Sequence, residues 1–407
     1  MWTWSPEASV ALAGGHTAVS RVDVLQGGQP VYTLEVVSGV VSSDATRPVR
    51  ANLACTLVDP TGALSTGDVE DLLDPYECEI APWRGVQFAV TTAAPVDVPN
   101  AGFGLQPFGI SGFGGLDSST SYTTRIETEL APLGVFALTS RAVSDGPNGL
   151  TIQLSGQDRA MGYQVPMRTA LAIPGATPVE TAIAKLLAAA NPKTHLLAMS
   201  TGQTVGPLLY APDIDVWREA QDLAVSVGAS LYHDRTGHCV LMPAAASRVP
   251  VASYGEGDGL LLTVDRAEDS DTIRNVVIAE STNGVIRAVV SDDDTSSPTY
   301  AGGKYGYRPV TLTNQHFSTV AMAQQAAAAR LVYELGRTET TVITAVPDPG
   351  RDVGDVLTIN RPRAGLTSRG VVVETLDMPL GADQPMKVGC RKSVLAPDGA
   401  VLEEQAA

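Results

Sequence analysis

The residues of this 407-residue sequence that could bind a metal or transfer protons include only five histidines. Two of them, His233 and His238, stand close to Asp234 and Cys239, as in a small metal site. They lie across an expected hairpin turn, however, and side chains along a hairpin alternate between its two faces. We therefore interpret them as solvated turn residues. The sequence also contains no G-x-S-x-G elbow and no HExxH pair.

Carboxylates are the other residues with catalytic potential. Asp213 and Asp215 stand where a helix is expected to begin, so capping of free amides explains them without catalysis. The run "SDDDTSS" at 291–297 is typical of a polar surface loop, with a weak calcium site as the alternative. We expect no catalytic residue, no metal site and no cofactor.

The stretch "NAGFGLQPFGISGFGG" at 100–115 is rich in glycine and could be mistaken for a phosphate-binding loop. A P-loop needs Lys-Ser or Lys-Thr after its glycines, and a dinucleotide fingerprint needs a following helix; neither is present. One interpretation is a long spacer loop, residues 96–122, between two strands. We favour the other, in which Phe103, Phe108 and Phe113 dock on a partner, because exposed phenylalanines leave apolar surface unburied.

Composition and charge narrow the class of protein. The formal net charge is −17, which argues against a nucleic-acid binder, since such proteins need a basic footprint. The sequence shows neither a secretory leader nor an apolar run of about 18–20 residues, so we expect a protein made in the cytosol. Four single cysteines form no CxxC pair, and a Cys55–Cys78 disulfide is not expected in that compartment.

The elements that would position these residues fall into three regions. Residues 1–157 read as strands: "VRANLACTLVD" alternates apolar and polar side chains with a period of two. Residues 158–246 switch to helical periodicity. One helix is expected after a capping box at 177–180 and another from Asp215, followed by a hairpin turning at 234–237.

Residues 247–395 return to strands, with one helix capped by Ser318 and ended by Gly336, and residues 396–407 are expected to be a flexible C-terminal tail. The predicted fold class is mainly β with an α/β insert. Two β-barrel domains, 1–157 and 247–395, flank the insert, and loop 96–122 belongs to the first.

Several short motifs, in order along residues 130–390, resemble those of one protein family. They are "PLG-x-F" (Pro132, Leu133, Gly134, Phe136), "L-x-G-x-D" (Leu154, Gly156, Asp158), "D-x-x-G" (Asp234, Gly237), Asn275, "YG-x-R" (Tyr305, Gly306, Arg308) and "P…GD-x-V" (Pro349, Gly354, Asp355). The family is the baseplate hub, or tail-associated minor tail protein, of long-tailed bacteriophages.

The resemblance implies a structural protein of the virion tail, assembled in the host cytoplasm, and not an enzyme. Hubs of this family are usually homotrimers whose six tail-tube-like barrels form a ring that continues the tail tube. The implied partners are copies of the chain, the tail tube or a distal tail protein, other baseplate or tail-tip proteins, and tape-measure protein in the lumen. DNA would pass without specific binding. Several members carry a peptidoglycan-cleaving extension, which we do not expect here.

Two alternatives remain: a receptor- or carbohydrate-binding tail protein, and a cell-wall hydrolase. The first needs exposed aromatic platforms, and the sequence has four tryptophans, two of them at residues 2 and 4. The second needs a convergent acidic pocket. For the hub, the net charge of −17 predicts a channel lined mostly by acidic and small polar side chains, because a basic channel would bind the DNA duplex.

Overall fold

The computed structural model describes residues 2–59, 73–75, 78–96, 119–147, 149–244 and 249–394. Within them the chain is mainly β, as predicted. The helices are α1 Pro6–Ala13, α3 Val179–Ala190, α4 Val216–Ser226 and α5 Val320–Gly336, with short 3-10 turns η2 Arg159–Tyr163, η3 Ser270–Thr272 and η4 Pro362–Ala364.

The strands of the N-terminal part are β1 Thr17–Gln26, β2 Gln29–Glu35, β3 Ser38–Asp44, β4 Ala51–Asp59, β5 Glu79–Val96, β6 Ser119–Pro132, β7 Phe136–Gly146 and β8 Gly149–Asp158. Those of the middle part are β9 Leu171–Ile173, β10 Leu196–Ala198, β11 Leu208–Tyr210, β12 Ala229–His233 and β13 Cys239–Pro243. The rest are β14 Ala252–Gly255, β15 Leu261–Glu268, β16 Val276–Glu280, β17 Arg287–Ser291, β18 Pro309–Thr313, β19 Glu339–Ala345, β20 Val356–Arg361, β21 Leu366–Pro379 and β22 Met386–Lys392.

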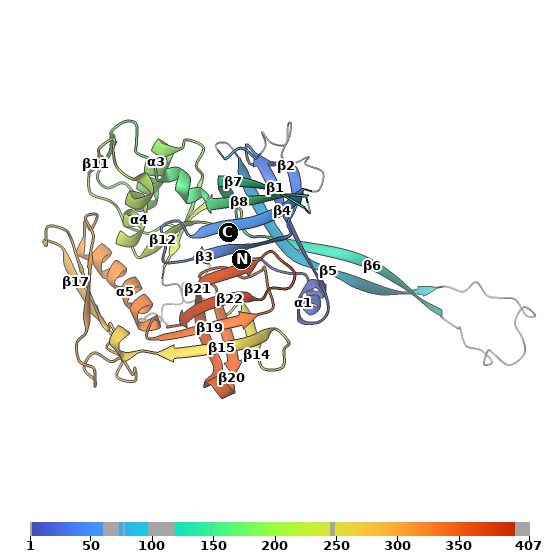
Figure 1. Cartoon of the computed structure of the whole chain (residues 1–407). Coiled ribbons are helices and arrows are strands. Elements are labelled where there is room, and N and C mark those ends of the chain that lie inside the picture. Colours follow the sequence, from blue (N-terminus) through green and yellow to red (C-terminus); the bar gives the residue numbers. More distant parts are fainter. Residues whose placement is uncertain are drawn as a thin grey trace, which may run out of the picture.

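One sheet of fourteen described strands joins the two ends of the chain. Its main path runs β15-β19-β22-β21-β3-β4-β8-β7-β5-β1-β2, with β6 beside β5 and with β14 and β20 branching from β21. Strands β3 and β21 form the join, antiparallel, from Val40 opposite Pro379 to Asp44 opposite Thr375. Figure 1 shows blue N-terminal strands next to red C-terminal ones. Because the described path is open, with β2 and β15 at its ends, two closed barrels are not confirmed.

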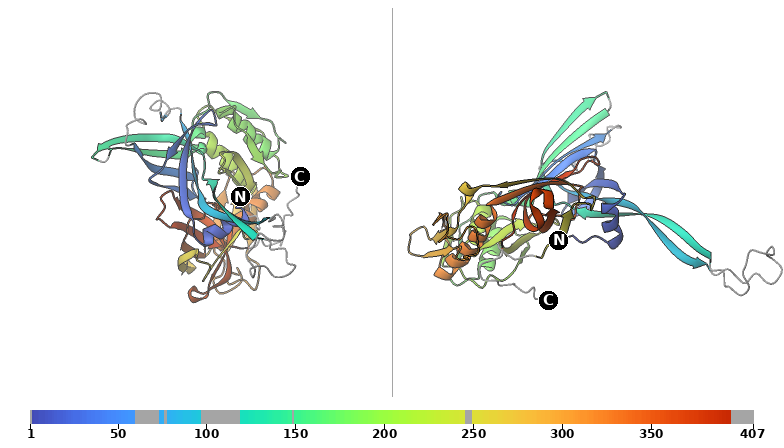
Figure 2. Two further views of the ribbon diagram at one scale, coloured as in Figure 1. Left: turned by 90° about the vertical axis from the view of Figure 1, so that its right-hand side faces the viewer. Right: turned by 90° about the horizontal axis from the view of Figure 1, so that it is seen from below.

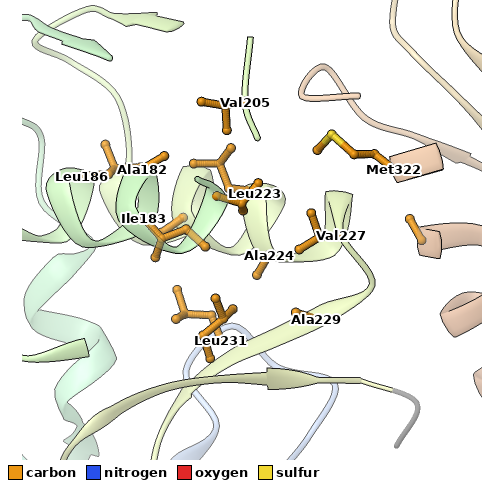
Figure 3. Packing of buried hydrophobic residues seen from close by; sticks show 14 of the residues in the cluster. Ala182, Ile183, Leu186, Val205, Leu223, Ala224, Val227, Ala229, Leu231 and Met322 are labelled. Atoms are coloured by element: carbon orange, nitrogen blue, oxygen red, sulfur yellow. The ribbon is translucent and has the colours of Figure 1, made fainter. Parts of the chain in front are cut away.

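The main sheet has one hydrophobic core, and a second core packs around helices α3, α4 and α5. Helix α3 packs on α4, α4 packs on β12 of the β10-β13-β12 sheet, and α5 packs against β16 and β17 of the β17-β16-β18 sheet. Figure 3 shows Met322 of α5 on the side of Leu223 and Val227, in the same cluster as Ile183 of α3 and Leu231 of β12. This core therefore extends beyond residue 246 into the stretch assigned from sequence to the second barrel. The domain boundaries 157, 246 and 395 stay a prediction, and the tail at 396–407 lies outside the described residues.

Helix starts were predicted with mixed success. Asp215 caps α4 as expected, since its Oδ1 accepts from Arg218 N at 3.0 Å. The capping box at 177–180 is wrong: Pro178 takes the cap position without a side-chain cap, and Thr177 Oγ1 donates to Pro174 O instead. The cap of α5 is Thr319, whose Oγ1 accepts from Met322 N, while Ser318 donates to Thr204 O and so ties the helix start to the preceding core.

Strands β5 and β6 form a long two-stranded ribbon, here called the arm. They pair antiparallel from Trp83 opposite Pro132 to Val96 opposite Ser119. The arm leaves the body of the molecule and extends well beyond the other strands in Figure 1 and in the right-hand view of Figure 2. It places Val96 and Ser119, which flank most of the predicted loop 96–122, far from the body of the molecule, while residues 97–118 themselves lie outside the described part.

Candidate functional site: the arm and the motif junction

The base of the arm is fixed to both halves of the main sheet. Gly85 of β5 lies so close to β6 that a Cβ atom there would stand 1.8 Å from Glu129 O, so only glycine fits. Next to it, the buried Arg84 guanidinium donates to Pro379 O and to Gly381 O of the C-terminal strand region. The arm therefore starts from a rigid point beside the β3–β21 join.

Helix α1 braces the same base. Ser5 caps α1 by accepting from Ala8 N, and its own hydroxyl donates to Glu129 Oε2 of β6 at 2.7 Å. Trp4 Nε1 donates to buried Asp348 Oδ1 at 2.9 Å, near the C-terminal strands. The apolar side of α1 packs on the base of the arm in a small cluster: Trp4, Ala8, Ala11, Leu12, Val86, Phe88 and Ala131.

Beyond this base the two strands pair with each other, and the described side chains of β6 at 123–126 are exposed. Ile126 is 72% exposed, and Thr123, Thr124 and Arg125 are exposed beside it. One cross-strand contact, between the hydroxyls of Thr91 and Thr124 at 3.0 Å, links solvent-exposed side chains. An isolated two-stranded ribbon is marginally stable in water, so a neighbour covering the arm would add stability that the arm lacks alone. The three residues predicted to dock, Phe103, Phe108 and Phe113, lie outside the described residues, and their docking stays a prediction.

The sequence motifs, by contrast, gather inside the body of the molecule at a place here called the motif junction, formed around Gly134, Phe136, Asp158, the 234–237 turn and residues 349–355. Phe136 is fully buried, and Gly134, at φ +140°, lies against its ring, where a Cβ would be 2.7 Å from Cε2. Asp158 accepts from Ala51 N at 2.9 Å and from Ala160 N at 2.8 Å. Burial raises the pKa of this carboxyl, and the two backbone N–H groups oppose the rise.

The hairpin turn links three segments that are distant in sequence. Its Gly237 carbonyl accepts from Arg159 Nη1 at 2.9 Å, and Arg159 also pairs with Glu79 at 2.7 Å through Nε and Nη2. Arg235 donates to Pro349 O and to Asp352 Oδ2, in the "P…GD-x-V" segment. A cavity of about 30 Å³ remains at the junction, which is too small for a substrate. The motifs therefore hold the fold together.

Asn275 and the "YG-x-R" turn form a second closed unit. Asn275 is fully buried; its Nδ2 donates to Thr299 O and Gly306 O, both at 2.9 Å, and its Oδ1 accepts from Arg308 N at 2.8 Å. The sequence analysis named Asn275 and the Gly306–Arg308 turn as separate motifs, and the structure shows that they are hydrogen-bonded to each other. The roles of Glu79, Arg84 and Trp4 were missed, because nothing local marks a residue whose partner lies far along the chain.

The histidines and cysteines near the turn have structural surroundings. His233 is not the solvated turn residue expected from the sequence: its ring packs against both Tyr163 and Trp217, with centroids 5.6 and 5.2 Å away, and those two rings are 5.7 Å from each other. Burial lowers the pKa of His233 to about 4. His238 is exposed and its Nδ1 contacts Thr236 Oγ1. All four cysteines are buried and free, and burial raises the pKa of Cys239 to about 12, so this thiol is unreactive at neutral pH. No group of three metal-binding side chains occurs among the described residues.

The acidic residues weighed for catalysis are similarly engaged. Asp292 accepts from the hydroxyls of Ser297 and Thr299, both at 2.6 Å, and Asp294 caps the same loop through Ser296. A hollow of about 390 Å³ lies beside α4 and is lined by Asp215, Glu219 and Asp222. There Glu219 accepts from Gln315 and from His316, and Asp215 caps α4. Burial, with the neighbouring Glu219, raises the pKa of Asp222. An acidic cluster of this kind does not by itself define a catalytic site.

Comparison with known proteins identifies the fold. A tail protein from Neisseria meningitidis MC58 matches at a TM-score of 0.58 and 16% identity, over 94% of this chain and 99% of that one. The 43 kDa tail protein of prophage MuSo2 from Shewanella oneidensis matches at 0.58 and 12%, over 92% and 98%. Prophage tail protein gp18 from Listeria monocytogenes EGD-e matches at 0.50 and 9%, over 91% and 94%. The chain has the fold of phage tail proteins.

This likeness covers nearly the whole of both chains in the first two comparisons, so the tail-protein fold accounts for the main sheet and for the α/β region together. No protein-family model matches the sequence, and no curated protein matches it. None of the helices in the described part is long and apolar enough to cross a membrane.

Proposed function

We propose that this protein is a structural hub at the distal end of a phage tail, where it forms a ring that continues the tail tube and connects it to the baseplate or tail tip. The observation that carries the proposal is the continuous main sheet, in which N-terminal and C-terminal strands meet at β3 and β21. A single chain thereby supplies two neighbouring segments of one curved wall. The whole-length likeness to tail proteins supports the same role.

Three copies would give six segments, which suits a six-fold tube. The main sheet ends at β2 on one side and at β15 on the other, and Figure 1 shows the two at opposite ends of the sheet. Both are largely exposed; Val31 is 45% and Leu262 is 49% exposed. Open edges of this kind favour pairing with another chain. Because the two edges differ, head-to-tail pairing of β2 with β15 closes a ring of three identical copies and leaves neither of these two edges free.

In this ring the N-terminal strands and the C-terminal strands of the main sheet, which meet at β3 and β21, each correspond to one tail-tube-like barrel domain. We further propose that the central channel is lined mostly by acidic and small polar side chains, consistent with the net charge of −17. Such a lining repels the DNA duplex and prevents it from binding during passage. Before ejection the channel leaves room for tape-measure protein.

The arm supplies the second kind of contact. It projects from the braced base beside the β3–β21 join, and beyond that base it exposes Ile126 and several threonines. We propose that the arm, with Phe103, Phe108 and Phe113 beyond its described end, contacts a neighbouring copy or an adjacent tail-tip protein. This contact would couple the ring to the rest of the baseplate.

Cysteine cross-linking tests the ring. A chain carrying Val31→Cys in β2 and Leu262→Cys in β15 should, on oxidation, form covalent dimers and trimers and stop at three. The native cysteines are all buried, so they give little background. Each single-cysteine variant is the control and should not produce the trimer. If the double variant stays monomeric, or forms open ladders longer than three, the β2–β15 ring is wrong.

A further inference from the structure

A cavity of about 390 Å³ lies between the two cores of the molecule. One wall comes from α5, through Arg330 and Tyr333, and an adjoining wall from β21 and β22, through Glu374 and Arg391. Arg50, which precedes β4, and Tyr232 of β12 complete the polar part. The size is that of a pocket for a small molecule or a few peptide residues.

The charge of this cavity is opposite to that of the whole chain. Three guanidinium groups, of Arg50, Arg330 and Arg391, line it, and among its described lining residues Glu374 is the one acidic side chain. Arg330 is engaged with Glu334 of the same helix, and Tyr333 donates to Glu374 Oε1 at 3.0 Å. Since the chain as a whole carries −17, a basic cavity inside it is a specific feature.

Of these three cations, Arg391 has the fewest contacts with groups that would balance its positive charge. Its guanidinium stands 5.1 Å from the ring centre of Tyr333, and it makes no hydrogen bond or ion pair with the described part of the chain. Burial lowers the pKa of Arg391, and Glu374 opposes that effect. Gly336, at the end of α5, leaves space for the Arg391 guanidinium, because a Cβ atom on residue 336 would lie 2.9 Å from Arg391 Nη1. A half-buried cation of this kind favours an anionic partner.

We propose that this cavity binds peptide carboxylates, and that the segment following Val394 in the same chain supplies them. Ser393 and Val394 themselves line the cavity. The next thirteen residues, 395–407, contain Asp398, Glu403 and Glu404 and no lysine or arginine. Residues 395–407 also contain aliphatic side chains. These suit the apolar part of the cavity, which Val332 and Val356 line. The inference rests on this chain alone and is independent of the ring.

Limited proteolysis of the full chain tests it. A Glu-specific protease releases the C-terminal residues by cutting after Glu403 or Glu404, which intact mass spectrometry measures. Because a hydrogen bond to a charged group contributes about 1.5–3 kcal/mol, Arg391→Gln should raise the cleavage rate about tenfold or more. Arg330→Gln, on the α5 wall and 40% exposed, is a second variant and should raise the rate in the same direction. Because Arg330 pairs with buried Glu334, urea titration of this variant first establishes that it is folded.

The control is Arg363→Gln, whose exposed guanidinium pairs with Glu256 away from the cavity and should leave the rate unchanged. Equal cleavage of the unmodified chain and of both cavity variants would overturn the proposal. If cleavage is equal but an added oligo-glutamate peptide binds the unmodified chain and not Arg391→Gln, the cavity takes the carboxylates of another chain, and the assignment to residues 395–407 is wrong.

Discussion

The arm and the motif junction use the same kinds of residue in opposite ways. At the junction, Phe136 is fully buried, Asp158 accepts two backbone hydrogen bonds and Arg159 is paired with Glu79, so these side chains find their partners inside the chain. In the arm, Ile126 is 72% exposed and the neighbouring threonines face solvent. The junction therefore serves folding, whereas the arm exposes side chains that, in the proposed function, contact a neighbouring copy or tail-tip protein.

This difference predicts that substitutions affecting folding can be distinguished from substitutions affecting assembly. Substitutions at the junction should lower the free energy of unfolding and affect assembly only through it. Substitutions in the arm should leave the isolated chain as stable as before and weaken assembly. The predictions below run from the largest effect on stability to the smallest.

Phe136→Ala should have the largest effect. It empties a fully buried ring position beneath Gly134 and Gly156, and such truncations cost about 3–5 kcal/mol. Urea titration of the isolated chain measures the loss. Phe88→Ala at the base of the arm is the matched aromatic control, and it should cost less because its small cluster has fewer buried members. A loss below about 1 kcal/mol for Phe136→Ala would show that the junction is not a core.

Asn275→Ala should cost on the order of 3 kcal/mol, because it leaves Thr299 O, Gly306 O and Arg308 N without their buried partner. The matched control is Asn283→Ala in an exposed turn, where Asn283 Oδ1 accepts from Ser281 Oγ and Val285 N. That control should lose less than about 1 kcal/mol. Equal losses in the two variants would contradict the structural role assigned to Asn275.

His233 makes the stability of the junction depend on pH. Its pKa is about 4 in the folded chain against an ordinary value of 6.5, so the unfolded chain takes up the proton first as the pH falls. Stability should therefore be highest above pH 6.5 and fall by about 2–3 kcal/mol between pH 7 and pH 4 through this residue.

His233→Phe keeps the stack on Tyr163 and Trp217 and removes the titration, and His233 Nδ1 has no hydrogen-bond partner in the described part of the chain that the change would break. The difference in unfolding free energy between the two chains, measured from pH 7 to pH 4, should grow in favour of the phenylalanine variant. A constant difference would mean that His233 is not buried as a neutral ring.

Ile126→Ser should change the free energy of unfolding by less than about 0.5 kcal/mol, because the side chain is exposed. Replacing Phe103, Phe108 and Phe113 together by serine should likewise leave the folding of the isolated chain unchanged. Both changes should reduce the yield of assembled tails counted by electron microscopy. If tails assemble normally with both variants, the arm is only a spacer, and the proposed contact between the arm and a partner is wrong.

Sequence reasoning worked where the signal was local. The alternation around Leu53 and Leu57 predicted a strand, Asp215 predicted a helix start, and Asp234 with Gly237 predicted the turn of a hairpin. The capping box failed because Pro178, and not Thr177, takes the cap position of α3.

The long-range features could not be predicted in this way. Nothing in the segment "SGVVSSD" indicates that β3 pairs with β21, more than 300 residues later in the chain. The packing of α5 in the core of the α/β region was missed for the same reason, since an apolar helix face does not identify the sheet that the helix covers. The motifs were found in the right order, but only the structure shows that most of them meet at one junction.

The measurement that tests the central claim most directly is a cryo-electron microscopy reconstruction of the assembled tail with this chain in place. The account predicts three copies around the tail axis, with the β2 edge of each copy paired to the β15 edge of the next, and an acidic channel through the middle. A monomer or dimer on the axis, or a ring whose β2 and β15 edges remain unpaired, would contradict it.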